Sequence, residues 1–426
     1  MKKTLLTLIL SALGGWTATL AQTSGGIELT LIRNGALWKG DARIIAPGQQ
    51  PSNVLRDLKV TRNQVTFTTN VLAIELRFRG KLTGDRLRGT VEGFQGSTQI
   101  SRGTWVVTRQ KPGPRGEVLA GRWSGTFDLQ TSSPPGAQPG SDPAFDAKVA
   151  HRAYLADSPN VLFDEAHENT DTSAGRYKPF SDLITGDGYR VVPNGQRFSQ
   201  STLKGHQVLV IVNASGPRGR RDAAAFTEAE CDAVRDWVDA GGALLLITDH
   251  APFSAAATAL AKRFGVELTI GHTFDTLHYN KESGDQTELL FSREDGLLGE
   301  HPITRGRDDT ERINRIITFS GTSVKGPPES VLLLKLGSTA MDVLPPDRKP
   351  SSPDEPAPDH KTVSAAGRAQ GLALEFGKGR VVILSEAAML TAQVAPSGFR
   401  FGMNLSGNDN RQLALNVMHW LSGLLK

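Results

Sequence analysis

The chain has 426 residues, with 48 Lys and Arg against 44 Asp and Glu, so its formal charge of +4 is small for its length. This near balance excludes a strongly basic nucleic-acid-binding protein, and we expect no nucleic-acid partner. The length predicts two or three domains. Cys231 is the only cysteine, which excludes an internal disulfide.

The N-terminus has the pattern of a secretory signal peptide. Lys2 and Lys3 precede an apolar run at residues 5–13, and a candidate cleavage site, Thr19-Leu20-Ala21, precedes Gln22. The run is too short to span a membrane, and no later stretch reaches the roughly 18 to 20 apolar residues that a spanning helix needs. We predict a signal peptide over residues 1–21 and a periplasmic or secreted protein. The alternative is an uncleaved anchor. Loss of the two lysines lowers the formal charge from +4 to +2.

Residues 22–130 are predicted to form an all-β barrel or sandwich. Short runs such as VTFTT and IELRFRG alternate apolar and polar side chains, and turns such as Thr83-Gly84-Asp85 join them. The phrasing resembles the small β-barrel modules that precede catalytic domains in some exported bacterial hydrolases. Residues 131–150 are rich in Pro, Gly and Ser and are predicted to be a linker.

Residues 151–426 alternate strand-like and helix-like segments. The strand-like runs are NVLFDEAH, YRVVP, HQVLVIVNA, ALLLITDH and GRVVILSEA. Between them, FTEAECDAVRDWVDAGG predicts a helix with Thr227 as N-cap, Glu230 completing a capping box, Cys231 buried, and Gly241-Gly242 ending it. Apolar strands that alternate with helices predict an α/β fold, with a mostly parallel sheet between helices on both faces.

Polar side chains follow four of the predicted strands. In an open α/β sheet, ligands bind beyond the carboxyl ends of parallel strands. Asn213 follows one of these strands, and acids or histidines follow the other three. A single Asp at a strand end is usually a helix cap, but four such ends together predict a site. The candidate catalytic residues are Asp164, Glu165, His167, Asp249, His250 and Glu386.

Two kinds of chemistry are open to this set. His167, Asp249 and His250 are the ligand types of a divalent metal such as zinc, which would lower the pKa of a bound water, with Glu165 or Glu386 as general base. Without a metal, a His–carboxylate pair still serves as acid and base. The spacing matches no established metal motif, so the cofactor stays open.

The stretch FDEAHEN, residues 163–169, spells the DEAH box of a helicase, but the chain lacks the G-x-x-x-x-G-K-[ST] phosphate loop. We therefore exclude a helicase. The chain also lacks a G-x-S-x-G elbow, which disfavours an ordinary serine α/β-hydrolase.

Three phrases carry a family resemblance: FDEAHENTDTSAGRYKPFSDLITGDGYRV, WVDAGGALLLITDHAPF and GRVVILSEAAMLTAQ with NDNRQLALNVMHWL. They resemble a glutamine-amidotransferase-like domain of unknown function in exported and envelope proteins of bacteria, over about residues 160–426. The resemblance implies a flavodoxin-like sheet related to class I glutamine amidotransferases. Glutaminase activity does not carry over, because that family needs a Cys on the elbow, which this chain lacks. No catalytic residue is inherited.

The sequence thus predicts an exported hydrolase, with or without a metal, that acts on a glycan, ester or amide. The alternative is a non-catalytic envelope protein whose amidotransferase-like domain, residues 151–426, binds a carbohydrate or a protein partner. Whether the protein is an enzyme, and how many copies associate, stay open. The expected partner is a small-molecule or glycan substrate.

Overall fold

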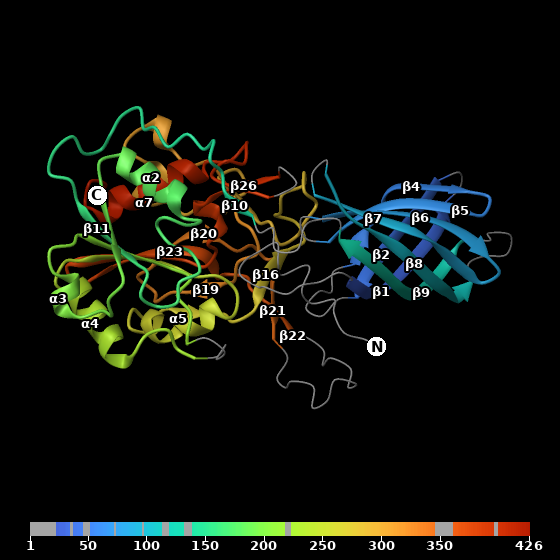
Figure 1. Cartoon of the computed structure of the whole chain (residues 1–426), viewed down its shortest axis with the longest axis horizontal. Coiled ribbons are helices and arrows are strands. Elements are labelled where there is room, and N and C mark those ends of the chain that lie inside the picture. Colours follow the sequence, from blue (N-terminus) through green and yellow to red (C-terminus); the bar gives the residue numbers. More distant parts are fainter. Residues whose placement is uncertain are drawn as a thin grey trace.

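The computed structural model describes ten stretches of the chain: residues 23–34, 37–45, 52–71, 74–95, 98–112, 119–131, 139–217, 223–345, 361–395 and 399–426. The predicted signal peptide and residues 132–138 of the predicted linker lie outside these stretches. Figure 1 shows an N-terminal sheet, in blue and teal, beside a larger part that holds all the labelled helices.

The N-terminal sheet is antiparallel and nearly closes into a barrel. Its strands follow the order β3-β2-β1-β9-β8-β7-β6-β5-β4. Their bounds are β1 Thr23–Asn34, β2 Leu37–Ile45, β3 Ser52–Val54, β4 Arg56–Thr61, β5 Gln64–Val71, β6 Ile74–Thr83, β7 Arg86–Gln95, β8 Thr98–Pro112 and β9 Gly121–Thr131.

The alternation of side chains in the sequence gives this sheet its interior. Phe67 and Phe78 stack with ring centroids 4.7 Å apart, and Trp105 meets both rings edge-on. The two outermost strands, β3 and β4, are separated along the chain only by Leu55, which is buried and whose N–H donates to the carbonyl of Gly40 on β2. The sheet therefore has its own apolar core.

The second large sheet is mixed. Its order is β12-β11-β13-β14-β24-β23-β19-β15, with β20 pairing to β23. The first five strands pair in parallel, whereas β23, β19, β15 and β20 pair antiparallel. Their bounds are β11 Asn160–Asp164, β12 Arg190–Asn194, β13 Val208–Val212, β14 Ala243–Ile247, β15 Glu267–Leu268, β19 Val324–Lys325, β20 Val331–Lys335, β23 Ala369–Phe376 and β24 Gly379–Leu384.

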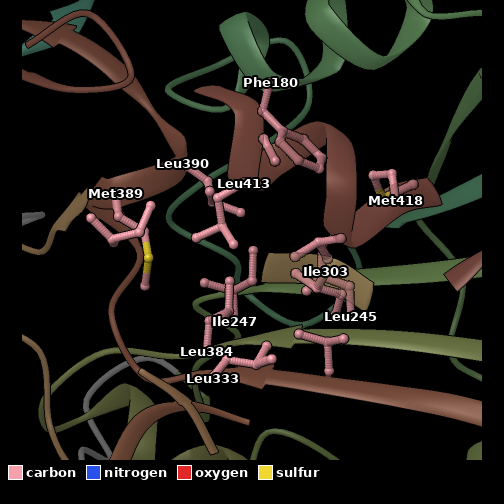
Figure 2. Close-up of a cluster of buried hydrophobic side chains, with 14 of the residues drawn as sticks. Phe180, Leu245, Ile247, Ile303, Leu333, Leu384, Met389, Leu390, Leu413 and Met418 are labelled. Carbon is pink, nitrogen blue, oxygen red and sulfur yellow. The ribbon is translucent and has the colours of Figure 1, made fainter. Parts of the chain in front are cut away.

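Helices cover both faces of the mixed sheet. On one face, α2 (Lys178–Gly186), α6 (Pro302–Arg305) and α7 (Asn410–Leu421) share an apolar core with β14 and β24, and Figure 2 shows Phe180, Ile303, Leu413, Leu245 and Leu384 among its side chains. On the other face lie α3 (Gln200–Leu203), α4 (Glu228–Asp239) and α5 (Phe253–Lys262), with Cys231 buried as predicted.

Smaller sheets complete the structure. β10 (Gly140–Ser141) pairs with β25 (Ala392–Val394), which pairs with β26 (Arg400–Gly402). β16 (His272–Asp275), β21 (Ala340–Leu344) and β22 (Lys361–Ser364) form a second, and β17 (Leu290–Ser292) with β18 (Arg315–Ile317) a third. Two short 3₁₀ turns, η1 (Asp309–Glu311) and η2 (Ala388–Leu390), lie among them.

The predicted fold class, a flavodoxin-like α/β fold built on a mostly parallel sheet, is wrong. The protein is mostly β, with 41% strand against 17% helix, and its large antiparallel near-barrel sheet is not part of a helix-rich parallel fold. The second sheet also departs from the prediction, because residues 267–376, expected to lie between strands, contribute four antiparallel strands to it. Two of those strands, β15 and β19, have only two residues each, which is too few for a periodic pattern to show in the sequence.

Candidate functional site

The candidate site lies where parallel strands of the mixed sheet end. Val212 on β13 is level with Ile247 on β14, and Ile247 is level with Leu384 on β24. The residues that follow these three positions, Asn213, Asp249 and Glu386, therefore leave the sheet at one edge. All three are buried. The register of the strands brings these polar groups together.

Asp164 and His167 form a separate network with Glu230. The Nδ1 atom of His167 lies 2.8 Å from Asp164 Oδ1, and its Nε2 atom lies 2.9 Å from Glu230 Oε1. Carboxylates accept hydrogen bonds, so both ring nitrogens donate and the imidazole is protonated. The rings of Phe198 and Phe226 lie against His167, each with its centroid 4.7 Å away. His167 therefore joins the end of β11 to helix α4.

The pKa shifts of His167 and Glu230 fit a structural link between β11 and α4. Burial opposes the charged ring, but the hydrogen bonds and charges of Asp164 and Glu230 outweigh it and raise the pKa of His167. Burial likewise works against the Glu230 carboxylate, but its bonds to His167 and Thr227 lower its pKa to about 2. Glu230 is also the capping-box residue at the start of α4, as predicted from the sequence. A ring with both nitrogens bonded is poorly placed to act as a base or a metal ligand.

Glu165 lies in the loop after β11 and supports that loop. Its Oε1 atom accepts hydrogen bonds from the backbone N–H of Ser173 at 2.9 Å and from the Ser173 hydroxyl at 2.6 Å. Both bonds hold the loop after β11 together.

Asp249 and Glu386 form a coupled pair of buried carboxyls. Burial is the main cause that raises the pKa of Asp249 to about 6, and the charge of Asp171 adds to it. Burial and then the charge of Asp249 raise the pKa of Glu386 well above its usual range, although Glu386 accepts N–H bonds from Ala388 and Met389 at 2.6 and 2.8 Å. The two groups titrate as a pair, and both ionise less readily than a carboxyl in water.

His250 lies beside this pair but bonds elsewhere. Its backbone N–H donates to Asp249 Oδ1 at 2.7 Å, whereas its Nε2 atom is 3.7 Å from the same oxygen. Its Nδ1 atom lies 3.0 Å from the carbonyl oxygen of Ala251. The side chain is therefore near Asp249 without a direct hydrogen bond to it.

A narrow pocket of about 20 Å³ opens beside Asp249. Asp171, Arg176 and Asn213 line it together with Asp249. Asn213 Nδ2 donates to Asp171 Oδ2 at 2.8 Å, and Arg176 lies 3.5 Å from Asp171 Oδ1. The other lining residues are Pro139, Phe319, Ala387, Ala388, Thr391, Gln393 and Phe401.

The carbonyl oxygen of the Asn213 side chain is an unused acceptor at this pocket. Asn213 is only 5% exposed, and its Oδ1 atom has no hydrogen-bond partner among the described residues. Its backbone is left-handed, with φ at +43°, a conformation that Asn tolerates better than most residues. A buried polar atom without a partner costs about 1–3 kcal/mol, so such an atom in a pocket indicates a place for a ligand or water.

Sequence reasoning identified Asn213, Asp249 and Glu386 at strand ends but missed Asp171 and Arg176. Both lie in the loop of residues 165–177 after β11, and nothing in their spacing marks them. Their proximity to the carboxyl pair is confirmed by Tyr177, whose hydroxyl donates to the Ala387 carbonyl at 2.6 Å. Burial, and then the charges of Asp171, Glu386 and Asp249, raise the pKa of Tyr177.

The predicted metal ligands do not fit a zinc site. Both ring nitrogens of His167 face carboxylates of Asp164 and Glu230, whereas Asp249 lines the pocket together with Asp171. Within the described part of the chain, no group of three or more His, Cys, Asp or Glu residues could hold a metal ion. We derive no step through a metal.

No helix among the described residues is long and apolar enough to cross a membrane.

Comparison with known proteins finds only distant likenesses. No family model matches the chain, and no curated protein matches it. The mmIFT52 N-terminal domain is 16% identical, with 62% of this chain and 97% of that chain covered and a TM-score of 0.42. The exo-β-1,4-mannosidase Op5Man5 from Opitutaceae bacterium strain TAV5 is 11% identical, with 54% and 31% covered and a TM-score of 0.26. The β-galactosidase from Bacillus circulans sp. alkalophilus is 7% identical, with 62% and 31% covered and a TM-score of 0.27. These structures do not show a glutamine-amidotransferase-like domain, and that resemblance stays a prediction.

Proposed function

We propose that the part of the protein around the mixed sheet is a binding module, and that its sheet-edge pocket takes one polar group of a small ligand such as a carbohydrate. The observation that carries this proposal is the Asn213 Oδ1 atom, which is buried at the pocket without a partner among the described residues. A ligand that donates a hydrogen bond there would relieve the cost of that buried acceptor.

Binding is favoured over hydrolysis by the way the expected catalytic groups are used. His167 is held by two carboxylates and two aromatic rings. Glu165 accepts hydrogen bonds from the backbone N–H and the hydroxyl of Ser173 at 2.9 and 2.6 Å. These contacts stabilise the fold, so neither group is poised for proton transfer or attack.

The second candidate is a hydrolase of a glycan, ester or amide, and the Asp249–Glu386 pair favours it. A carboxyl with a pKa of about 6 at a pocket is suited to general acid–base catalysis near neutral pH. Arg176 at the same pocket could stabilise developing negative charge. Perturbed pKa values of this kind also occur in purely structural clusters.

The binding function is tested with two variants, Asn213→Gly and Asp285→Asn. Purified chain from residue 22 onward is screened by thermal shift against sugars and small polar molecules, and hits are measured by calorimetry. Asn213→Gly keeps the left-handed backbone and removes the acceptor, so we expect it to lose the binding. Asp285→Asn is the matched control, because Asp285 is also buried with its pKa raised to about 6 but does not line the pocket.

A parallel assay with glycoside, ester and amide substrates tests the hydrolase. Turnover by the unmodified protein that falls at least about a hundredfold in Asp249→Asn, but not in Asp285→Asn, would establish the second candidate instead of the first. A hit that Asn213→Gly and Asp285→Asn bind equally well would overturn the pocket as the binding site.

A further inference from the structure

The hydrogen-bonding groups at the pocket are mainly acceptors. The Asp171 carboxylate already accepts from Asn213 and from the Thr170 hydroxyl, at 2.8 and 3.0 Å. The side-chain NH₂ of Asn213 donates to Asp171, and its unpartnered Oδ1 is an acceptor that a ligand can use. Asp249 adds a second carboxylate to the wall. A ligand group that fits must therefore donate hydrogen bonds.

The negative charge of the pocket favours a ligand whose hydrogen-bond donor is cationic. Asp171 and Asp249 line the pocket, and the charge of Asp249 adds to burial in raising the pKa of nearby Glu386, which favours the neutral form of that side chain. Arg176 is the one cationic side chain among the lining residues, and it is directed to Asp171. Ionised carboxylates in excess of cations attract a positive donor more strongly than a neutral hydroxyl.

The size of the pocket limits the group further. About 20 Å³ is close to the space that one water molecule needs. An ammonium group has similar dimensions and three N–H donors, which match the three acceptors Asp171, Asp249 and Asn213. A guanidinium is a wider planar fork with five donors, so it fits this space less well.

We propose that the sheet-edge pocket binds the protonated primary amine of a small molecule. Asn213 Oδ1 and the Asp249 carboxylate accept two of its N–H groups, and the Asp171 carboxylate supplies the rest of the counter-charge. This rests on the proposed binding function, to which it adds the chemical class of the ligand. An amino sugar satisfies both.

Calorimetry with methylammonium chloride, at constant ionic strength and pH 8, tests the recognition directly. Methanol and tetramethylammonium chloride are the matched probes, because the first lacks charge and the second lacks N–H donors. We expect only methylammonium to bind measurably. We further expect Asp249→Asn and Asn213→Gly each to weaken it by about tenfold or more, because the first removes a negative charge beside the ammonium and the second removes one of its acceptors. Asp285→Asn should leave the affinity unchanged.

A second comparison separates this proposal from the broader one. Glucosamine and N-acetylglucosamine differ in the charge of one nitrogen, so the amine proposal requires glucosamine to bind more tightly. If methylammonium does not bind, or binds equally to all variants, the amine proposal is wrong. If N-acetylglucosamine or glucose binds and Asn213→Gly abolishes that binding, the pocket is a ligand site but not an amine site. Thermal unfolding of each variant shows whether it is folded, and Asp249→Asn, which preserves shape, serves if Asn213→Gly does not fold.

Discussion

At the scale of single residues, Glu230 has two functions at once. One carboxylate oxygen accepts from the backbone and hydroxyl of Thr227 at the start of α4, and the other accepts from His167. The capping box was readable from the sequence because its residues are three positions apart. The bond to His167 was not, because 63 residues separate the partners.

Replacing Glu230 should destabilise the fold strongly. Glu230→Gln leaves protonated His167 with one carboxylate partner instead of two, and it places an amide beside the donors of His167 and Thr227. We therefore expect the free energy of unfolding at pH 7 to fall by about 3 kcal/mol. Urea denaturation measures this loss. Glu228→Gln, in the same first turn but exposed, should cost less than about 1 kcal/mol.

The acid dependence of this loss has a definite sign. Because folding lowers the pKa of Glu230 from 4.5 to about 2, its stabilisation is complete above pH 4.5 and disappears as the pH falls toward 2. The two proteins should therefore converge in acid. An unchanged difference down to pH 2 would contradict the assignment.

Asp249 is predicted to act in the opposite direction. Its pKa is raised in the folded protein from 3.8 to about 6, so ionisation destabilises the fold, and stability falls as the pH rises through this interval. Asp249→Asn should be more stable than the unmodified protein at pH 8, on the order of 2 kcal/mol, and similar to it at pH 4. Thermal unfolding between pH 4 and 8 measures this. If the stability of the variant changes with pH in the same way as that of the unmodified protein, the ionisation of Asp249 does not destabilise the fold.

At the scale of secondary structure, the hairpin β23–β24 brings antiparallel strands to the parallel group. Phe376 pairs with Gly379 across the turn residues Gly377 and Lys378, and Gly377 has φ at +57°. A Cβ atom on Gly377 would lie 2.2 Å from Asp239 Oδ1 and 2.7 Å from the Asp239 carbonyl oxygen. Only glycine meets both requirements of this turn.

Two glycine substitutions separate strain from crowding. Gly367 also has a positive φ, of +76°, but open space where its Cβ would be. Gly367→Ala should cost about 1–2 kcal/mol from backbone strain alone, and Gly377→Ala clearly more, by chemical denaturation. Equal losses would mean that Asp239 moves aside without cost.

The elements of the fold were predictable to different extents. Thr227, Glu230 and Gly241 marked α4 correctly, and the apolar runs before Asp164, Asn213 and Asp249 marked strands that do pair in parallel. The strands β15 and β19 have two residues each, too few for any period to show. Their pairing depends on contacts distant in the sequence, and so does the placing of Asp171 and Arg176 at the pocket.

At the scale of the whole molecule, the two large sheets have separate cores. The apolar core of the N-terminal sheet is made of residues between 27 and 129. The apolar clusters on the mixed sheet contain none of these residues. Segments with their own cores can fold independently. The predicted boundary at residues 131–150 remains a prediction, although β10 at Gly140 pairs with β25 of the C-terminal part.

Independent cores predict two thermal transitions. Scanning calorimetry of residues 22–426 should resolve two unfolding events, and a fragment of residues 22–131 should reproduce one of them. Asp249→Asn should shift only the other. A single transition, or a fragment without cooperative unfolding, would show that the N-terminal sheet depends on the rest of the chain.

The single residue Leu55 between β3 and β4 has a consequence for how copies of this protein behave when crowded. These strands are the first and last of the N-terminal sheet, and an open sheet presents two such margins with free backbone groups that recruit strands from other molecules. Here a single residue, Leu55, connects the edge strand β3 to the edge strand β4, and its backbone N–H donates a hydrogen bond to the Gly40 carbonyl. The backbone through Leu55 therefore holds the two edge strands β3 and β4 next to each other. We expect this link to limit the pairing of these edges with strands of other molecules.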